Sequence, residues 1–190
     1  MTTDLLTLPE TALITAEEYA LLPDEVLRSS ELVRGRVVKM PRPNFAHGNV
    51  QVKVGTALEN YATGTNSGRV TVESGVLTEP DTIRGPDVAY WSYGRLPLDV
   101  TPKVFSDVAP DLIAEVISPS NSRREIARKI REYLAAGTSV VWVVDPEDRS
   151  VTVYRKPGDG RVIWDDAVID CDDVLPGFSC LVANFFGAAR

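Results

Sequence analysis

The strongest constraint on the fold comes from two apolar segments that stand on either side of an amphipathic one. Residues 111–118 (DLIAEVIS) and 139–145 (SVVWVVD) carry apolar side chains on both faces, as strands in the middle of a sheet do. Residues 122–136 between them have the period of a helix and end at Gly137, a residue type that often terminates helices. This order predicts a βαβ unit and therefore an α/β (or α+β) chain.

The rest of the chain is expected to complete a mixed central β-sheet flanked by helices. Thr15 and Glu18 fit a capping box at the start of a short helix that stops near Pro23. Residues 31–40 (ELVRGRVVKM) alternate around Gly35 as a hairpin does. The other predicted elements are a helix at 47–62, strands at 69–78, 86–91 and 151–156, and a short helix near the C-terminus. We expect one domain over residues 1–190.

Composition and cysteine usage narrow the class of protein. The chain of 190 residues is 44% hydrophobic, which fits one domain with its own core. No apolar run approaches the ~20 residues of a membrane-spanning helix, and the N-terminus lacks the pattern of a signal peptide. Cys171 and Cys180 fit reduced thiols, with a disulfide as the alternative. These features predict a cytoplasmic protein that does not contact a membrane.

The charge is acidic overall but unevenly distributed. With 20 basic and 27 acidic residues the net charge is −7, which argues against a protein that coats DNA non-specifically, because such binding depends on neutralising phosphates. Two basic clusters each fit either a localised basic face or a solvated surface of mixed sign. The first comprises Arg34, Arg36, Lys39 and Arg42, and the second comprises Arg123, Arg124, Arg128, Lys129 and Arg131.

The chemistry available to the chain is limited, because His47 is its single histidine. The G-x-S-x-G motif that could supply a nucleophilic serine is missing, and one histidine with two cysteines cannot readily complete a zinc site. The sequence also has no phosphate-binding loop and no dinucleotide-binding glycine motif. Carboxylate chemistry remains, with or without a hard metal ion such as Mg²⁺.

Two acidic residues lie in or beside predicted strands. Asp87 follows Pro86 at the start of one strand, and Glu115 lies inside the apolar run of another. A buried acid costs several kcal/mol unless it is paired or bound to a metal. Asp87 fits a functional acid or an ordinary turn residue, and Glu115 fits a functional acid or a partner in a structural ion pair.

A lysine on the amphipathic helix can reach these acids. Lys129 borders the apolar stripe of residues 122–136, so its stem can be buried while its ammonium group reaches the sheet. The alternative is a surface pair with Glu125 one turn away, which would contribute only ~0.3–0.5 kcal/mol. The stripe consists of Ile126, Ile130, Tyr133 and Leu134.

Taken together, these segments resemble the Uma2 family (DUF820) of restriction-endonuclease-like proteins. The matching motifs occur in the family order over residues 15–155. They are ELVRGRVV with Glu31 and Gly35, Pro43 with His47, PDVAYW, PDLIAEVISPSN, EIARKIREY and AGTSVVWVVDP. The resemblance implies a restriction-endonuclease-like fold with a site of the PD-(D/E)xK type.

The resemblance also assigns roles to individual residues. Asp87 matches the aspartate of the PD motif, and Glu115 matches the acid of (D/E)xK. The lysine position of that motif falls on Ile117, and Lys129 on the following helix matches the family's replacement for it. The implied catalytic residues are Asp87, Glu115 and Lys129; the implied metal ligands are Asp87, Glu115, Glu31 and the carbonyl of Val116; the auxiliary candidates are His47, Glu125 and Tyr133.

The implied activity is that of a nuclease that uses Mg²⁺ (or Mn²⁺) to hydrolyse phosphodiester bonds of nucleic acid, with DNA as the expected partner. A homodimer is expected because cutting both strands of a duplex needs two sites. The alternative is a non-catalytic scaffold that binds nucleic acid or protein and keeps the same residues as a buried ion-pair network. A metal or water cluster between Asp87 and Glu115 that is open to solvent would favour the enzyme, and a closed pair between Glu115 and Lys129 would favour the scaffold.

Overall fold

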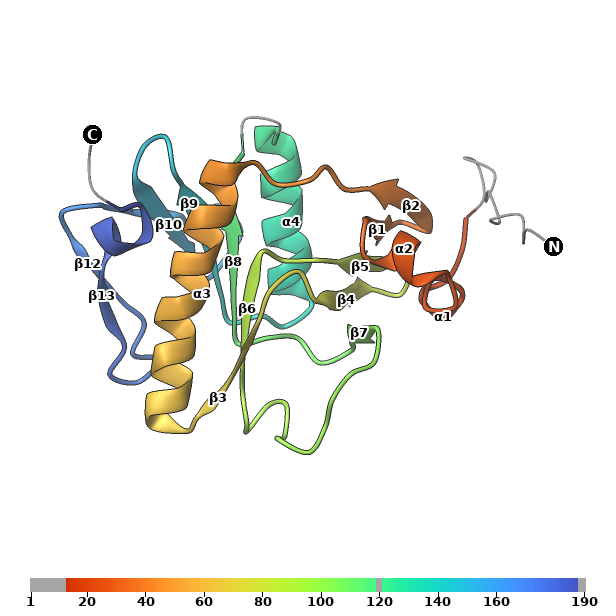
Figure 1. Cartoon of the computed structure of the whole chain (residues 1–190), viewed down its shortest axis with the longest axis horizontal. Helices are drawn as coiled ribbons and strands as arrows, with labels where there is room; N and C mark the ends of the chain where they lie inside the picture. The colour runs from red at the N-terminus through yellow and green to blue at the C-terminus, as the bar shows by residue number, and fades with distance from the viewer. Residues whose placement is uncertain (1–12, 119–120, 188–190) are drawn as a thin grey trace.

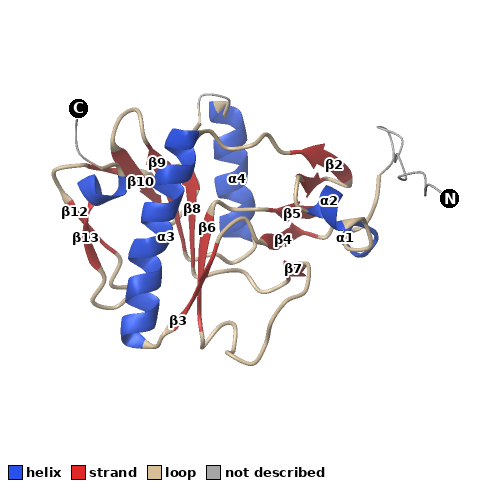
Figure 2. Cartoon of the chain, viewed as in Figure 1, coloured by secondary structure: helices blue, strands red, loops and turns tan. Residues whose placement is uncertain are grey.

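The computed structural model describes residues 13–118 and 121–187, whose strands form three sheets (Figures 1 and 2). The large sheet has six strands in the order β11-β10-β9-β8-β6-β3, and the small sheet has five in the order β2-β1-β5-β4-β7. The helices are α1 (Ala16–Tyr19), α2 (Asp24–Leu27), α3 (Phe45–Thr65), α4 (Arg123–Ala135) and the 3-10 helix η1 (Val182–Phe185). The strands are β1 (Ser30–Val33), β2 (Arg36–Lys39), β3 (Gly68–Thr71), β4 (Gly75–Glu79), β5 (Thr82–Arg84), β6 (Val88–Ser92), β7 (Phe105–Ser106), β8 (Leu112–Val116), β9 (Val140–Asp145), β10 (Ser150–Tyr154), β11 (Arg161–Trp164), β12 (Val168–Asp170) and β13 (Ser179–Leu181).

The βαβ unit at the centre of the large sheet is confirmed. Strands β8 and β9 are parallel, with Leu112 opposite Val140, and α4 connects them. All five residues of β8 are buried, as its two apolar faces predict. Helix α4 begins after Ser122, whose hydroxyl accepts a hydrogen bond from the Glu125 amide. It ends at Ala135, and Gly137 follows with a positive φ of 106°, which suits a residue without a side chain.

Helices cover both faces of the large sheet, with α3 on one side and α4 on the other (Figure 1). Leu58 of α3 packs in the same core as Leu112 and Trp142. Tyr133 of α4 packs in the opposite core with Ile113. Each fully buried aliphatic side chain of this kind contributes about 1.5–3 kcal/mol, so the two cores fix both helices to the strands between them.

The predicted hairpin forms the first two strands of the small sheet. Val33 pairs with Arg36, which leaves a turn of two residues, Arg34 and Gly35. Both have positive φ, at 52° and 74°, which is the geometry of the tight turn that matches strand twist. The capping box is also present, because the Thr15 hydroxyl accepts from the Glu18 amide and the Glu18 carboxylate accepts from the Thr15 amide.

Some predicted elements differ from the structure. Residues 69–78 were expected to form one strand, but the chain breaks at 72–74, so that β3 joins the large sheet and β4 the small one. The reason is local, because Glu73 has a φ of 51° and an extended chain cannot continue through it. The predicted helix after Thr15 is α1, which ends before Pro23 as expected, and a second short helix, α2, follows Pro23 and was not predicted. The C-terminal helix is a 3-10 turn, η1.

Two further expectations concern the cysteines and the membrane. Cys171 and Cys180 are free thiols, so the disulfide alternative is wrong. Within the part of the chain that the structure describes, no helix combines the length and the apolar character needed to cross a bilayer.

Candidate active site

The predicted acids and lysine meet at one end of the large sheet. Strands β6 and β8 are antiparallel with Val88 opposite Ala114, and one further step in this register puts Asp87 opposite Glu115. Side chains in directly opposed positions lie on the same face of a sheet. The Asp87 carboxylate also accepts a 2.6 Å hydrogen bond from the backbone amide of Val116. The register of two strands therefore brings together acids that lie 28 positions apart.

Glu115 is held by two side chains of α4. The Lys129 ammonium lies 3.1 and 3.0 Å from its two oxygens, and the Tyr133 hydroxyl donates to one of them at 2.5 Å. The side chains of Glu115 and Lys129 are only 6% and 5% exposed. The structure thus contains a closed, buried ion pair, and the alternative of a surface pair between Lys129 and Glu125 is wrong.

Burial has a large effect on the pKa values of Glu115, Lys129 and Tyr133. It raises the pKa of Glu115 to about 7, although Lys129 and the Tyr133 hydroxyl act in the opposite direction. Burial lowers the pKa of Lys129, but the carboxylates of Glu115 and Glu31 more than offset it, so the pKa lies above its ordinary value. Burial also raises the pKa of Tyr133. Lys129 is therefore a cation near neutral pH, and Tyr133 is a neutral donor.

Asp87 is oriented from α3 as well as from the sheet. The Asn44 side chain accepts from the His47 amide at the start of α3, which fixes the first turn of this helix. His47 Nε2 lies 3.1 Å from Oδ1 of Asp87, and Gln51 one turn later donates to the Asp87 carbonyl at 3.0 Å. The hydrogen bond to Asp87 raises the pKa of His47. His47 Nδ1 is buried and has no hydrogen-bond partner among the described residues.

A second ion-pair network lies beside the first. Arg84 of β5 is 2% exposed and lies 2.7 Å from a carboxylate oxygen of Glu31 and 2.7 Å from one of Glu132. The other oxygen of Glu31 accepts from the Gly85 amide at 3.0 Å and lies 3.5 Å from the Lys129 ammonium. Both oxygens of Glu31 are thus engaged, and Lys129 links the two networks.

The cluster has more acids than cations. Its four carboxylates belong to Asp87, Glu115, Glu31 and Glu132, and its two fully buried cations to Arg84 and Lys129. With all of these ionised and His47 neutral, the carboxylates outnumber the fully buried cations by two, and the partly exposed Arg128 lies 3.8 Å from Glu132. Hard oxygen donors with such an excess are the chemistry that Mg²⁺ and Mn²⁺ prefer. Within the described residues, however, no three His, Cys, Asp or Glu side chains are arranged as a metal-binding group.

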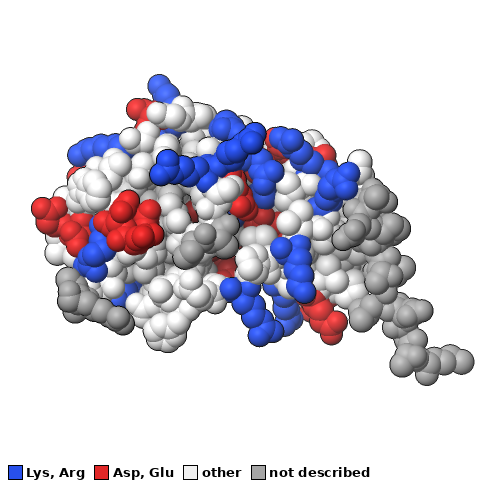
Figure 3. Space-filling model, turned by 90° about the horizontal axis from the view of Figure 1, so that it is seen from above, with Lys and Arg blue, Asp and Glu red and all other residues white. Residues whose placement is uncertain are grey.

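Basic side chains surround this end of the molecule. Figure 3 shows the side on which α3 and α4 begin, where Lys and Arg gather around a smaller acidic area. Lys129 does not belong to this surface, since it is buried in the cluster. The exposed basic residues of these segments are Arg34, Arg36, Lys39 and Arg42 in and after the first hairpin, Arg123 and Arg124 at the start of α4, and Arg131 further along α4.

Sequence reasoning missed three residues of the site, namely Gln51, Arg84 and Glu132. Two of them had a detectable signal: Gln51 lies one helical turn after His47, and Glu132 lies three positions after Lys129 on the same helix face. For Arg84 the sequence offers little indication of a role in the site beyond its position three residues before Asp87. Its partners lie 53 and 48 positions away, and no local pattern connects them.

Comparison with known proteins identifies the family and the fold of the chain. Residues 16–183 match the model of the Uma2 family, described as "Putative restriction endonuclease". A similar solved structure, from Anabaena variabilis ATCC 29413, is described as "a putative nuclease belonging to DUF820". The two chains are 24% identical, and they superpose with a TM-score of 0.77 over 91% of this chain and 97% of the Anabaena chain. At this level of identity the similarity establishes the fold alone. Among curated proteins, none matches. The match over most of its length shows that the chain belongs to the Uma2 family, and the predicted restriction-endonuclease-like fold is confirmed.

Proposed function

We propose that the protein is a metal-dependent nuclease that hydrolyses phosphodiester bonds of nucleic acid, with DNA as the preferred substrate. The observation that carries the proposal is the meeting of Asp87, Glu115 and Lys129 at one end of the sheet in a chain of the Uma2 family. The exposed basic residues around this end would attract the phosphates of the substrate and add to its affinity.

In this proposal each residue of the cluster has one task. Asp87, Glu115 and the carbonyl of Val116 would hold Mg²⁺ or Mn²⁺, with Glu31 as a further acid beside them. A bound divalent ion polarises a phosphate and lowers the pKa of bound water. Lys129 is a cation near neutral pH, so its task is to donate hydrogen bonds to the charge that develops on the phosphate rather than to remove a proton. His47 and Gln51 would keep Asp87 in position.

The second candidate is a non-catalytic scaffold that binds nucleic acid or protein. One observation favours it, namely the closed pair between Glu115 and Lys129, in which both side chains are almost fully buried. Ion-pair networks of this kind also occur in proteins without catalytic activity, and a shared fold does not guarantee a shared reaction.

Cleavage assays separate the two candidates. We expect purified protein with Mg²⁺ or Mn²⁺ to cleave DNA, and EDTA, Asp87→Asn and Glu115→Gln each to reduce the rate at least a hundredfold. Asp173→Asn is a matched control, because that carboxylate pairs at the surface with Arg155. Calorimetric titration with Mg²⁺ gives a second readout, in which the two site variants should lose the binding heat. Intact protein that binds DNA with full affinity but neither cleaves it nor binds the ion would support the scaffold.

We also propose a homodimer as the active form. A nuclease that cuts both strands of a duplex needs two sites, and two-fold symmetry is the commonest arrangement that supplies them. Light scattering coupled to size exclusion should give about twice the chain mass of 20.8 kDa at micromolar concentration. A monomer mass over the whole concentration range, with cleavage still present, would contradict this expectation.

A further inference from the structure

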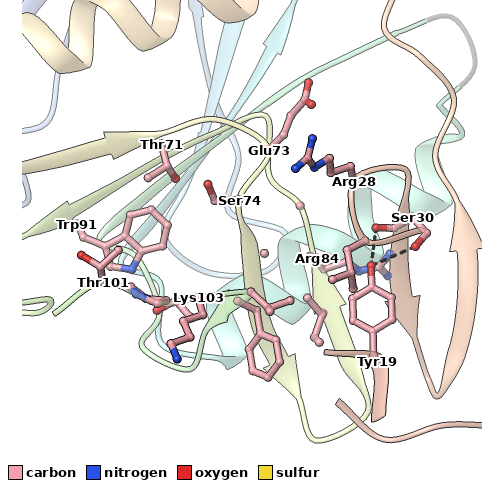
Figure 4. Close-up of a pocket in the computed structure, with 18 of the residues that line it drawn as sticks. Tyr19, Arg28, Ser30, Thr71, Glu73, Ser74, Arg84, Trp91, Thr101 and Lys103 are labelled. Atoms are coloured by element: carbon pink, nitrogen blue, oxygen red, sulfur yellow. Dashed lines mark hydrogen bonds between the residues drawn. The ribbon is translucent and has the colours of Figure 1, made fainter. Parts of the chain in front are cut away.

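A cavity of about 520 Å³ lies between the small sheet and the edge of the large one, beside the ion-pair cluster (Figure 4). Strands β3, β4, β5 and β6 contribute to its wall, together with the end of α2 and the segment 101–106. Its volume falls in the range of about 300–1,000 Å³ that is usual for sites of small ligands.

Three wall residues of the cavity belong to the site or contact its residues. Arg84 lines it and holds Glu31 and Glu132, and Gly85 lines it and donates to Glu31. Glu73 is the third, and its carboxylate accepts from the same Gln51 amide nitrogen that donates to the Asp87 carbonyl. A ligand in the cavity would therefore lie next to the residues that position the site.

The inner wall combines apolar surface with a polar atom that has no partner. Trp91 and Phe105 form part of the apolar wall, and Figure 4 shows Thr71 beside Trp91. The Thr71 hydroxyl is buried and makes no hydrogen bond with any described residue. A buried hydroxyl without a hydrogen-bond partner is unfavourable, and a ligand with a hydrogen-bonding edge would satisfy it.

The outer wall carries charges of both signs: Arg28 and Lys103 are cationic, and Asp24 and Glu73 are acidic. Arg28 and Lys103 both line the cavity and both are exposed to solvent. Arg28 has one partner at the surface, Asp24, at 3.2 Å, and this pair is about 80% exposed, so it offers little resistance to an incoming anion. The cavity thus combines an apolar wall beside the buried, unpaired Thr71 hydroxyl with cations and carboxylates at its rim. A nucleotide has the matching parts: a flat base with polar edges and an anionic phosphate.

We propose that the cavity is a subsite for one unpaired nucleotide of the substrate strand. The base would lie inside against the apolar wall with an edge near Thr71, and its phosphate would lie toward Arg28. This inference rests on the proposed nuclease activity, and it specifies the form of nucleic acid that the protein would cleave fastest. Because a base must leave the stack to enter a pocket, single strands and mismatched duplexes should be cleaved faster than fully paired ones.

Binding of nucleoside 5′-monophosphates tests the subsite without any cleavage. In calorimetric titrations with EDTA present, we expect at least one of dAMP, dGMP, dCMP and TMP to bind, and Thr71→Val to weaken that binding about fivefold to tenfold, as the loss of one hydrogen bond does. Thr101→Trp, which fills the cavity from an exposed position, should abolish it. Thr56→Val changes an exposed threonine of α3 in the same way and should have no effect.

A cleavage assay distinguishes failure of the nucleotide subsite from failure of the proposed nuclease activity. Monophosphates should compete with a single-stranded oligonucleotide, and Thr71→Val should raise KM with little change in kcat. If the protein cleaves DNA but binds no monophosphate and both cavity variants cleave normally, the subsite is overturned while the nuclease stands. If monophosphates bind and Thr71→Val weakens them but nothing is cleaved, the nucleotide site stands and the nuclease fails. If monophosphates accelerate cleavage without competing, the cavity holds an effector and the substrate subsite is overturned.

Discussion

Replacement of Arg84 by methionine is expected to lower the free energy of unfolding by about 3–5 kcal/mol, because it leaves buried carboxylates without their cation. Arg84 is 2% exposed and lies 2.7 Å from both Glu31 and Glu132, which are themselves 4% and 5% exposed. Methionine keeps much of the volume, so the loss reports on charge rather than on packing. Urea unfolding should show the loss, together with a fall in Tm of about 10 °C for a chain of this length.

Two further variants make this result specific. Arg128→Met removes a cation that reaches Glu132 only at 3.8 Å from a partly exposed position, so it should change stability by no more than about 1 kcal/mol. Glu31→Gln in the Arg84→Met background should restore part of the lost stability, because one unpaired charge is then removed. Strictly additive effects of the two substitutions would show that the pair is not coupled.

Substitutions of Glu115 and Lys129 are expected to act in opposite directions on stability. Lys129→Ala leaves Glu115 buried without its cation, which should cost about 3–5 kcal/mol. Glu115→Gln removes a charge that is costly to bury, so in EDTA it should be neutral or stabilising at neutral pH. Both should abolish metal-dependent cleavage. Thermal melts and cleavage assays on the same preparations measure the two effects, and a Lys129→Ala protein that cleaves normally would contradict the role given to this lysine.

The pH dependence of the free energy of unfolding tests whether the pKa of Glu115 is raised in the folded protein. Its pKa is about 7 in the folded protein and 4.5 in the reference state. Between these values the folded state holds more protons than the unfolded state, so the contribution of Glu115 to stability is present at low pH and is lost as the pH rises toward 7. In EDTA, Glu115→Gln should flatten the stability curve over this range. If the slope of stability against pH is unchanged in Glu115→Gln, groups other than Glu115 cause the pH dependence.

Much of the central architecture could be predicted because it depends on local patterns. The apolar runs at 111–118 and 139–145 and the helix between them indicate parallel strands without any knowledge of the rest. The turn at Arg34 and Gly35 has the same local character. Such features are fixed by residues within a few positions of one another, and a single sequence contains that information.

The candidate site could be predicted only in part, because its geometry depends on pairing between distant strands. That Asp87 lies opposite Glu115 follows from the register of β6 and β8, which no local pattern specifies. The family motifs indicated these two acids, but not Arg84, whose buried position depends on β1, β5 and α4 meeting in space. The break at Glu73 was missed for a related reason, since an apolar alternation can continue in sequence while the chain changes sheets.

The break between β3 and β4 also has a mechanical consequence. The chain passes between the large and small sheets several times, and two of these crossings, at 72–74 and at 85–87, are joined by a hydrogen bond of 3.1 Å from the Glu73 amide to the Pro86 carbonyl. The two crossings thus lie side by side and form a joint between the sheets. Asp87 stands at the end of the second crossing, so a rotation of the small sheet about this joint would turn the Asp87 carboxylate relative to Glu115, which is anchored in the large sheet.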